Sequence, residues 1–156
     1  MGLGPAFENR QRRIAVPVRA LIRTAERALR AVGREGGGVD VTVVDDAEIR
    51  RLNRAFRGVG RRTDVLAFPL EVAGAPGGLV GQIVISADTA HRQSRRLGIP
   101  LALELELLVT HGILHLAGYD DRDPVEAHLM HRRERDILSA GQARLPKRLW
   151  RGLLDP

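Results

Sequence analysis

The feature that most constrains this chain is a long apolar segment running from Ile99 to Ala117. Pro100 near its start and Gly118 after its end are typical of helix boundaries. Four ionisable side chains interrupt the segment: Glu104, Glu106, His111 and His115. Because such groups are costly inside a bilayer, the segment is a poor membrane span. It predicts instead a helix within a globular protein.

Length and composition favour one domain made by residues 1–156. The chain has 156 residues, of which 44% are hydrophobic and 28% charged, and that is ordinary for a single globular domain. It has no cysteine, so disulfides, thiolate metal sites and cysteine nucleophiles are excluded. The arginines among residues 10–13 interrupt any signal-peptide pattern. We therefore expect a cytoplasmic protein.

Strand and helix patterns alternate along the chain. Hydrophobic periodicity and turn residues predict strands at 39–43, 64–68 and 79–85, a loop at 73–78, and helices at 17–33, 45–56, 88–97, 100–117 and 123–141. This indicates an α/β (or α+β) fold with a small mixed sheet and about five helices. The sheet order cannot be read from these patterns. A basic tail, residues 142–156, carries leucines and a tryptophan at roughly helical spacing: Leu145, Leu149, Trp150 and Leu153.

Positive charge is concentrated in two arginine-rich stretches. The net charge is +6, and since Lys147 is the single lysine, 25 − 1 leaves 24 arginines. Six of them lie between Arg50 and Arg62 without an acid, and eight lie between Arg10 and Arg34 with one acid. Guanidinium groups pair with phosphate oxygens, so these clusters indicate a nucleic-acid partner. With only 3% aromatic residues, a base-stacking platform is not expected.

The apolar helix carries a candidate metal site. His111 and His115 are four residues apart, so both can face one ion from the same side of a helix. A left-handed turn at Gly118 can then bring Asp120 or Asp121 to that ion. Three protein ligands leave a fourth position open, as in catalytic zinc sites. We expect the other histidines, on polar helices, to be solvated, with His128 in reserve as a ligand: His91, His128 and His131.

These residues also carry a family resemblance. The stretch His111-Gly-x-Leu-His115-Leu-x-Gly-Tyr-Asp resembles the signature of the YbeY family of endoribonucleases, the rRNA maturation factors. Further similarities follow the order and spacing of that family over residues 38–140: Leu52-Asn53, Phe56-Arg57, residues 63–69, residues 81–86, and Met130 with Glu134.

Two positions depart from the family pattern. The family's usual third histidine, six residues after the second, is Asp121 here, and its usual Gly-Asp is Gly81-Gln82. Aspartate can bind zinc at a similar distance. Its charge would weaken the Lewis acidity of the ion, and its harder oxygen admits manganese or magnesium more readily.

The resemblance implies a metal-dependent endoribonuclease that cuts single-stranded RNA in rRNA maturation, including 16S 3′-end processing, and in ribosome quality control. It implies one Zn²⁺ on His111, His115 and Asp121, and a small-subunit rRNA partner rather than DNA or a membrane. Arg57 would stabilise charge on the phosphate, while Arg61 and Arg62 would grip flanking phosphates.

Two other functions remain open at this point. A zinc metalloprotease would share the two-histidine helix, but it needs a glutamate where this chain has Gly112. A non-catalytic ribosome-assembly or RNA-binding factor would use its metal only to hold the fold.

Overall fold

The structure, a computed structural model, describes residues 4–56, 65–70, 79–141 and 145–150. The elements in chain order are β1 (Pro5–Asn9), α1 (Val18–Ala31), β2 (Gly38–Val44), α2 (Asp46–Phe56), β3 (Val65–Pro69), β4 (Leu79–Ser86), α3 (Ala87–Leu97), α4 (Leu101–Leu116), α5 (Pro124–Ser139) and the 3₁₀ helix η1 (Lys147–Trp150). The predicted helices and strands all appear, close to their expected bounds. The predicted loop at 73–78 lies outside the described residues.

The strands form one mixed sheet in the order β1-β2-β4-β3. β2 pairs in parallel with β1 and with β4, whereas β3 pairs antiparallel with β4. At the centre of the sheet, Val41 is opposite Phe7 on one side and Ile83 on the other. The edge strand β1 was not predicted, because its sequence PAFEN lacks the alternating β-branched residues of a strand. This segment is a strand because it pairs with β2, which is far away in sequence.

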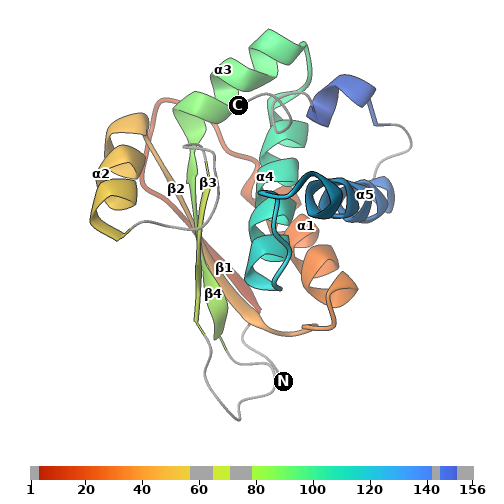
Figure 1. The fold of residues 1–156 in the computed structure, drawn as a ribbon. Helices are drawn as coiled ribbons and strands as arrows, with labels where there is room; N and C mark the ends of the chain where they lie inside the picture. Colours follow the sequence, from red (N-terminus) through yellow and green to blue (C-terminus); the bar gives the residue numbers. More distant parts are fainter. Residues whose placement is uncertain (1–3, 57–64, 71–78, 142–144, 151–156) are drawn as a thin grey trace.

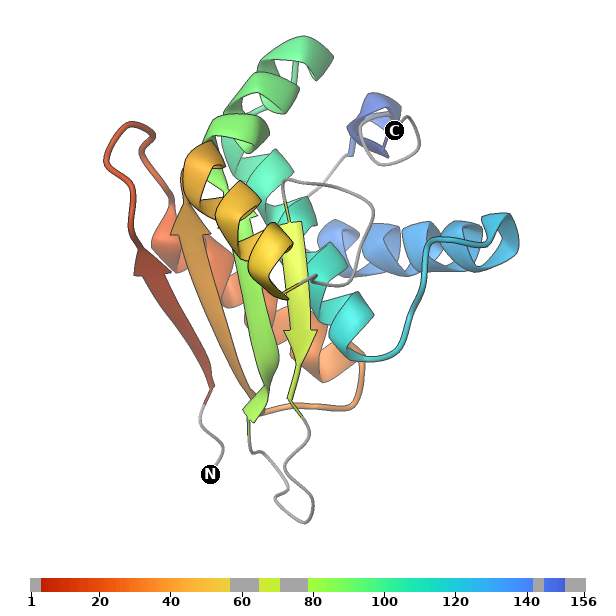
Figure 2. The same ribbon diagram turned by 60° about the vertical axis from the view of Figure 1, so that its left-hand side comes forward.

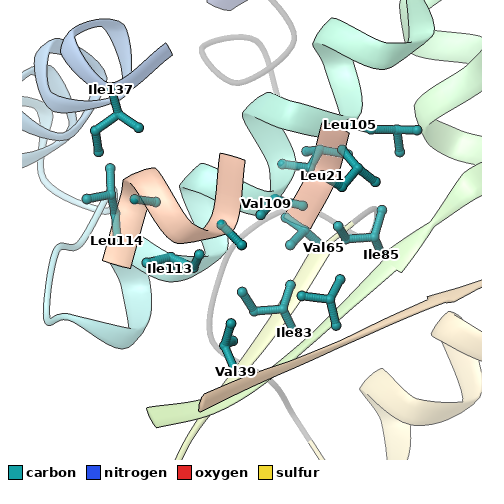
Figure 3. Close-up of a cluster of buried hydrophobic side chains, with 14 of the residues drawn as sticks. Leu21, Val39, Val65, Ile83, Ile85, Leu105, Val109, Ile113, Leu114 and Ile137 are labelled. Carbon is teal, nitrogen blue, oxygen red and sulfur yellow. The ribbon is translucent and has the colours of Figure 1, made fainter. Parts of the chain in front are cut away.

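Helices cover both faces of this sheet (Figures 1 and 2). On one face, α1 and α4 pack on the strands and α5 packs against these two helices, while α2 lies on the opposite face. Ile83 and Ile85 belong to the core beneath α1 and α4, together with Leu105 and Ile113 (Figure 3). Val84, between them in sequence, joins the smaller core beneath α2. Residues 83–85 of β4 are therefore buried on both faces of the sheet, which explains this run of three apolar residues.

A third apolar cluster attaches η1 to the helices. Leu149 and Trp150 pack with side chains from the α3–α4 turn, α4 and α5: Ile99, Leu103, Leu107 and Leu138. The apolar spacing noted in the tail thus has a packing role at Leu149 and Trp150, whereas Leu153 lies outside the described residues. Within the described ranges, none of the helices has the length and apolar content that crossing a membrane requires.

Side-chain caps fix where α2 and α5 begin, as Ser86 does for α3. Asp45 caps α2, because its Oδ1 accepts a hydrogen bond of 2.8 Å from the backbone N–H of Glu48. Asp123 caps α5 in the same way, accepting from the N–H of Glu126 at 3.2 Å. The segment between α4 and the α5 cap carries the third predicted ligand of the candidate metal site.

Candidate metal centre

The two histidines of α4 face one another inside the protein. His111 and His115 retain only 1% and 7% of their exposure, and Leu103 to His115 are all buried. Their Nε2 atoms are 3.0 Å apart and their rings stand nearly perpendicular, at 87°. The four-residue spacing therefore does what the sequence predicts and directs two imidazole nitrogens at one point.

The turn after α4 brings Asp121 to the same point. Gly118 adopts a φ of 101°, which a residue with a Cβ rarely tolerates, and this reverses the chain. Asp121 Oδ2 then lies 3.4 Å from His111 Nε2, and Oδ1 lies 3.7 Å from His115 Nε2. Among the described residues, His111, His115 and Asp121 form a group whose ligand atoms lie within 4.8 Å of one another and could hold a metal ion.

The alternative ligands lie elsewhere. Asp120 turns to Arg122 and forms an ion pair of 2.9 Å, and His128 is exposed on α5. His91 is only partly buried, on α3. His131, which we expected to be solvated, is instead 11% exposed and bonded through Nδ1 to Glu134 Oε1 at 2.7 Å. That expectation was wrong because α5 turns this side chain toward a buried carboxylate.

Each ligand histidine is held by its other ring nitrogen. His111 Nδ1 lies 2.6 Å from Glu134 Oε2, and His115 Nδ1 lies 3.0 Å from the carbonyl oxygen of Tyr119. Both partners are acceptors, so both Nδ1 atoms carry a proton and both Nε2 atoms face the centre. The sequence marks Glu134 only as part of a helix motif. Its role depends on the packing of α5 against α4, which residue spacing does not reveal.

The electrostatics of the group call for a positive charge at its centre. Burial disfavours an imidazolium, yet the carboxylates of Glu134 and Asp121 outweigh it and raise the pKa of His111 to about 9. Hydrogen bonds from His111 and His115 hold the pKa of Asp121 far below its usual range. Burial opposes ionisation of Glu134 as well, but His111 keeps the pKa of that carboxyl below its ordinary value. A proton or a metal cation can supply the missing charge.

The donor set fits a divalent cation such as zinc. Zinc bonds of about 2.0–2.2 Å place tetrahedral ligand atoms roughly 3.3–3.6 Å apart, and the observed separations of 3.0, 3.4 and 3.7 Å bracket that spacing. Asp121 Oδ1 is buried without a hydrogen-bond partner within 3.5 Å among the described residues, and it lies 3.7 Å from His115 Nε2, so it can serve as a ligand to an ion. Two imidazoles and one carboxylate leave one tetrahedral position open to water or substrate.

Gly112, between the two histidines, faces away from this centre. A Cβ placed there would lie 2.9 Å from Ile83 Cδ1, on the sheet side of α4. The glycine therefore permits close packing of α4 on the sheet, and a larger side chain would point into the core. A metalloprotease glutamate would have no access to the ion from this position.

The arginines predicted to contact the substrate come directly after α2 in the sequence. Arg57, Arg61 and Arg62 lie outside the described residues, so their roles remain predictions. The arginines of α2 that precede them are exposed: Arg50, Arg51 and Arg54.

Comparison with known proteins assigns the family. The family described as "Endoribonuclease YbeY" matches residues 6–142. The chain belongs to the YbeY family. A relative named "Endoribonuclease YbeY" from Moorella thermoacetica is 44% identical, over 76% of this chain and 85% of the relative. The relative of that name from Syntrophus aciditrophicus is 32% identical, over 88% and 89%.

Two further similar proteins match this chain over different shares of their lengths. The "Endoribonuclease YbeY" of Anaeromyxobacter sp. is 42% identical, but the match spans only 58% of that relative and 72% of this chain. The solution structure of TM1509 from Thermotoga maritima has a TM-score of 0.57 at 25% identity, covering 96% of this chain and 91% of that one. The fold is thus similar to that of TM1509 along almost its whole length.

Proposed function

We propose that this protein is a metal-dependent endoribonuclease that hydrolyses phosphodiester bonds of single-stranded RNA during rRNA maturation. The observation that carries the proposal is the convergence of His111, His115 and Asp121 on one point, in a chain of the YbeY family. The relatives are named endoribonucleases, and the arginine-rich surface suits a polyanionic substrate.

The chain's own residues would bind and orient the ion. His111 and His115 would offer Nε2 lone pairs, and Asp121 would offer a carboxylate oxygen. A bound divalent cation supplies Lewis acidity toward the phosphodiester and activates water. Zinc suits the imidazoles, and because the third ligand is an oxygen, manganese and magnesium are competitors for the site.

The arginines would bind the phosphates of the substrate. Arg57 would donate its guanidinium fork to the phosphate as negative charge develops there, and Arg61 and Arg62 would contact flanking phosphates. We place the activity in the cytoplasm on small-subunit rRNA, in 16S 3′-end processing and ribosome quality control.

One incubation series separates this proposal from its rivals. Zinc-loaded protein, chelator-treated protein and the His111→Ala variant are each mixed with an rRNA precursor and with a denatured protein substrate. We expect RNA cleavage by the zinc-loaded protein alone, and an intact protein substrate throughout. RNA cleavage that survives both metal removal and His111→Ala would overturn the proposal. Intact RNA in every sample would favour a non-catalytic assembly factor.

A further inference from the structure

The buried carboxylate of Glu134 joins the metal centre to a segment outside the family match. Its side chain is fully buried, and it accepts hydrogen bonds from three ring nitrogens in three different elements. Oε2 faces His111 Nδ1 of α4 at 2.6 Å. Oε1 faces His131 Nδ1 of α5 at 2.7 Å and accepts from Trp150 Nε1 of η1 at 3.2 Å. Trp150 follows the matched region, which ends at residue 142.

Trp150 is held firmly enough to position another group. Its indole is 4% exposed and packs in the apolar cluster that joins η1 to α4 and α5. The guanidinium of Arg135 lies 5.1 Å from the centre of its ring, within cation–π range. Arg148, two residues before Trp150, donates a hydrogen bond of 3.0 Å to the carbonyl oxygen of Gly98. Packing, stacking and this hydrogen bond together fix the direction of the indole N–H.

A fixed donor on one carboxylate oxygen controls the direction of the other. A carboxyl group rotates about its bond to the chain, and rotation of Glu134 would carry Oε2 away from His111. The indole and His131 both hold Oε1, so Oε2 remains aligned with His111 Nδ1. That alignment keeps a proton on Nδ1 and directs Nε2 toward Asp121 and His115.

We infer that Trp150 is a positioning residue of the metal centre, whose indole N–H orients Glu134 and, through it, the metal ligand His111. The inference rests on the proposed metal site and extends it to a residue that does not touch the ion. It also gives η1 a role in the site beyond packing.

Two substitutions in η1 separate positioning from packing. Trp150→Phe keeps an aromatic ring but removes the N–H, whereas Leu149→Ala opens a cavity in the same cluster without touching Glu134. Loss of a group that directly holds a metal ligand typically weakens binding about 10- to 100-fold. Trp150 is one hydrogen bond further away, so we expect Trp150→Phe to weaken zinc binding about 3- to 10-fold, as measured by competition with a chromophoric chelator. Leu149→Ala should lower the melting temperature and leave zinc affinity unchanged.

A spectroscopic measurement tests the link with Trp150 in place. The chain has a single tryptophan, so its two-dimensional ¹H–¹⁵N spectrum has one indole N–H peak. We expect this peak to shift when zinc is added to the wild-type protein, and to move when Glu134 is replaced by glutamine. The inference is overturned if zinc moves the ring signals of His111 and His115 while the indole peak stays in place, or if Trp150→Phe binds zinc like wild type. A wild-type protein that binds no zinc would instead refute the proposed function, and this inference with it.

Discussion

The metal centre and the arginine-rich stretch around α2 are built in opposite ways. The centre is buried, and each histidine is held on both ring nitrogens, by Glu134 or Tyr119 on one side and by its partners at the centre on the other. The described arginines of α2 are exposed, and Arg51 makes only a surface contact of 3.7 Å with Glu48. The centre thus depends on fixed geometry, whereas the arginine stretch depends on accumulated charge. Loss of a ligand side chain should therefore be severe in the first region, and loss of an arginine other than Arg57 should have a graded effect in the second.

The largest expected effect is loss of metal from the centre. His111→Ala or His115→Ala should remove nearly all bound zinc, because two remaining ligands hold the ion poorly. Elemental analysis of the purified variants measures this directly. His128→Ala, which alters an exposed histidine on α5, is the matched control and should keep its zinc. Stoichiometric zinc in both ligand variants would show that the site is elsewhere.

Arg57 tests whether one member of the arginine stretch acts in chemistry. Arg57→Ala should lower the rate of RNA cleavage about 10²- to 10³-fold, as loss of a group that stabilises transition-state charge does. Zinc content and thermal stability should stay near wild type. Arg57→Lys should rescue poorly, since it lacks the planar fork, and Arg54→Ala should show a much smaller loss. A fully active Arg57→Ala would make this residue an ordinary phosphate contact.

The metal-free centre should make stability depend on pH. The pKa of His111 is about 9 in the folded protein and has an ordinary value of 6.5. Because the pKa is raised on folding, the contribution of protonated His111 to the free energy of unfolding is fully present below pH 6.5 and is lost as pH rises through about 9. A shift of this size corresponds to roughly 3 kcal/mol, which urea unfolding at pH 6.5 and pH 9.5 in the presence of chelator would measure.

Two controls accompany the pH measurement. Glu134→Gln removes the charge that most raises the pKa of His111, so the difference between the two pH values should shrink. Bound zinc replaces the proton, so the free energy of unfolding of the zinc-loaded protein should decline much less between the two pH values. An equal decline with and without zinc would mean that the ion does not bind at these histidines.

The smallest expected effect comes from Asp121→His, which restores the family's usual third histidine. With zinc, two histidines and an aspartate carry a formal charge of +1, and three neutral histidines carry +2. The more positive centre should lower the pKa of the activated water, moving the pH–activity profile down by on the order of one unit. Metal content should be retained. A variant that keeps its metal but shows an unchanged profile would indicate that residue 121 does not contact the ion.

The local parts of this site were predictable from sequence, and the non-local parts were not. The four-residue histidine spacing, the reversal at Gly118 and the approach of Asp120 or Asp121 follow from helix and turn geometry within one short stretch, and the family resemblance selects Asp121. By contrast, the bond between Glu134 and His111 spans 23 residues and depends on how α5 crosses α4. The solvated state expected for His131 was wrong for the same reason.

The fold shows the same division. Periodicity and turn residues predict β2, β3, β4 and the five helices, because each element carries its own local pattern of residues. Strand β1 is formed by backbone pairing with β2, and the sheet order depends on which strands meet in space. Neither the pairing of β1 nor the sheet order can be recognised from the residues of a single segment.

The most direct test of the account is a high-resolution structure of the zinc-loaded protein with anomalous scattering data. We expect one zinc ion bonded to Nε2 of His111, Nε2 of His115 and a carboxylate oxygen of Asp121, at about 2.0–2.2 Å. Glu134 should still hold His111 Nδ1, and a fourth ligand from solvent should complete the coordination. An ion bound by other side chains, or an empty centre under saturating zinc, would contradict the account.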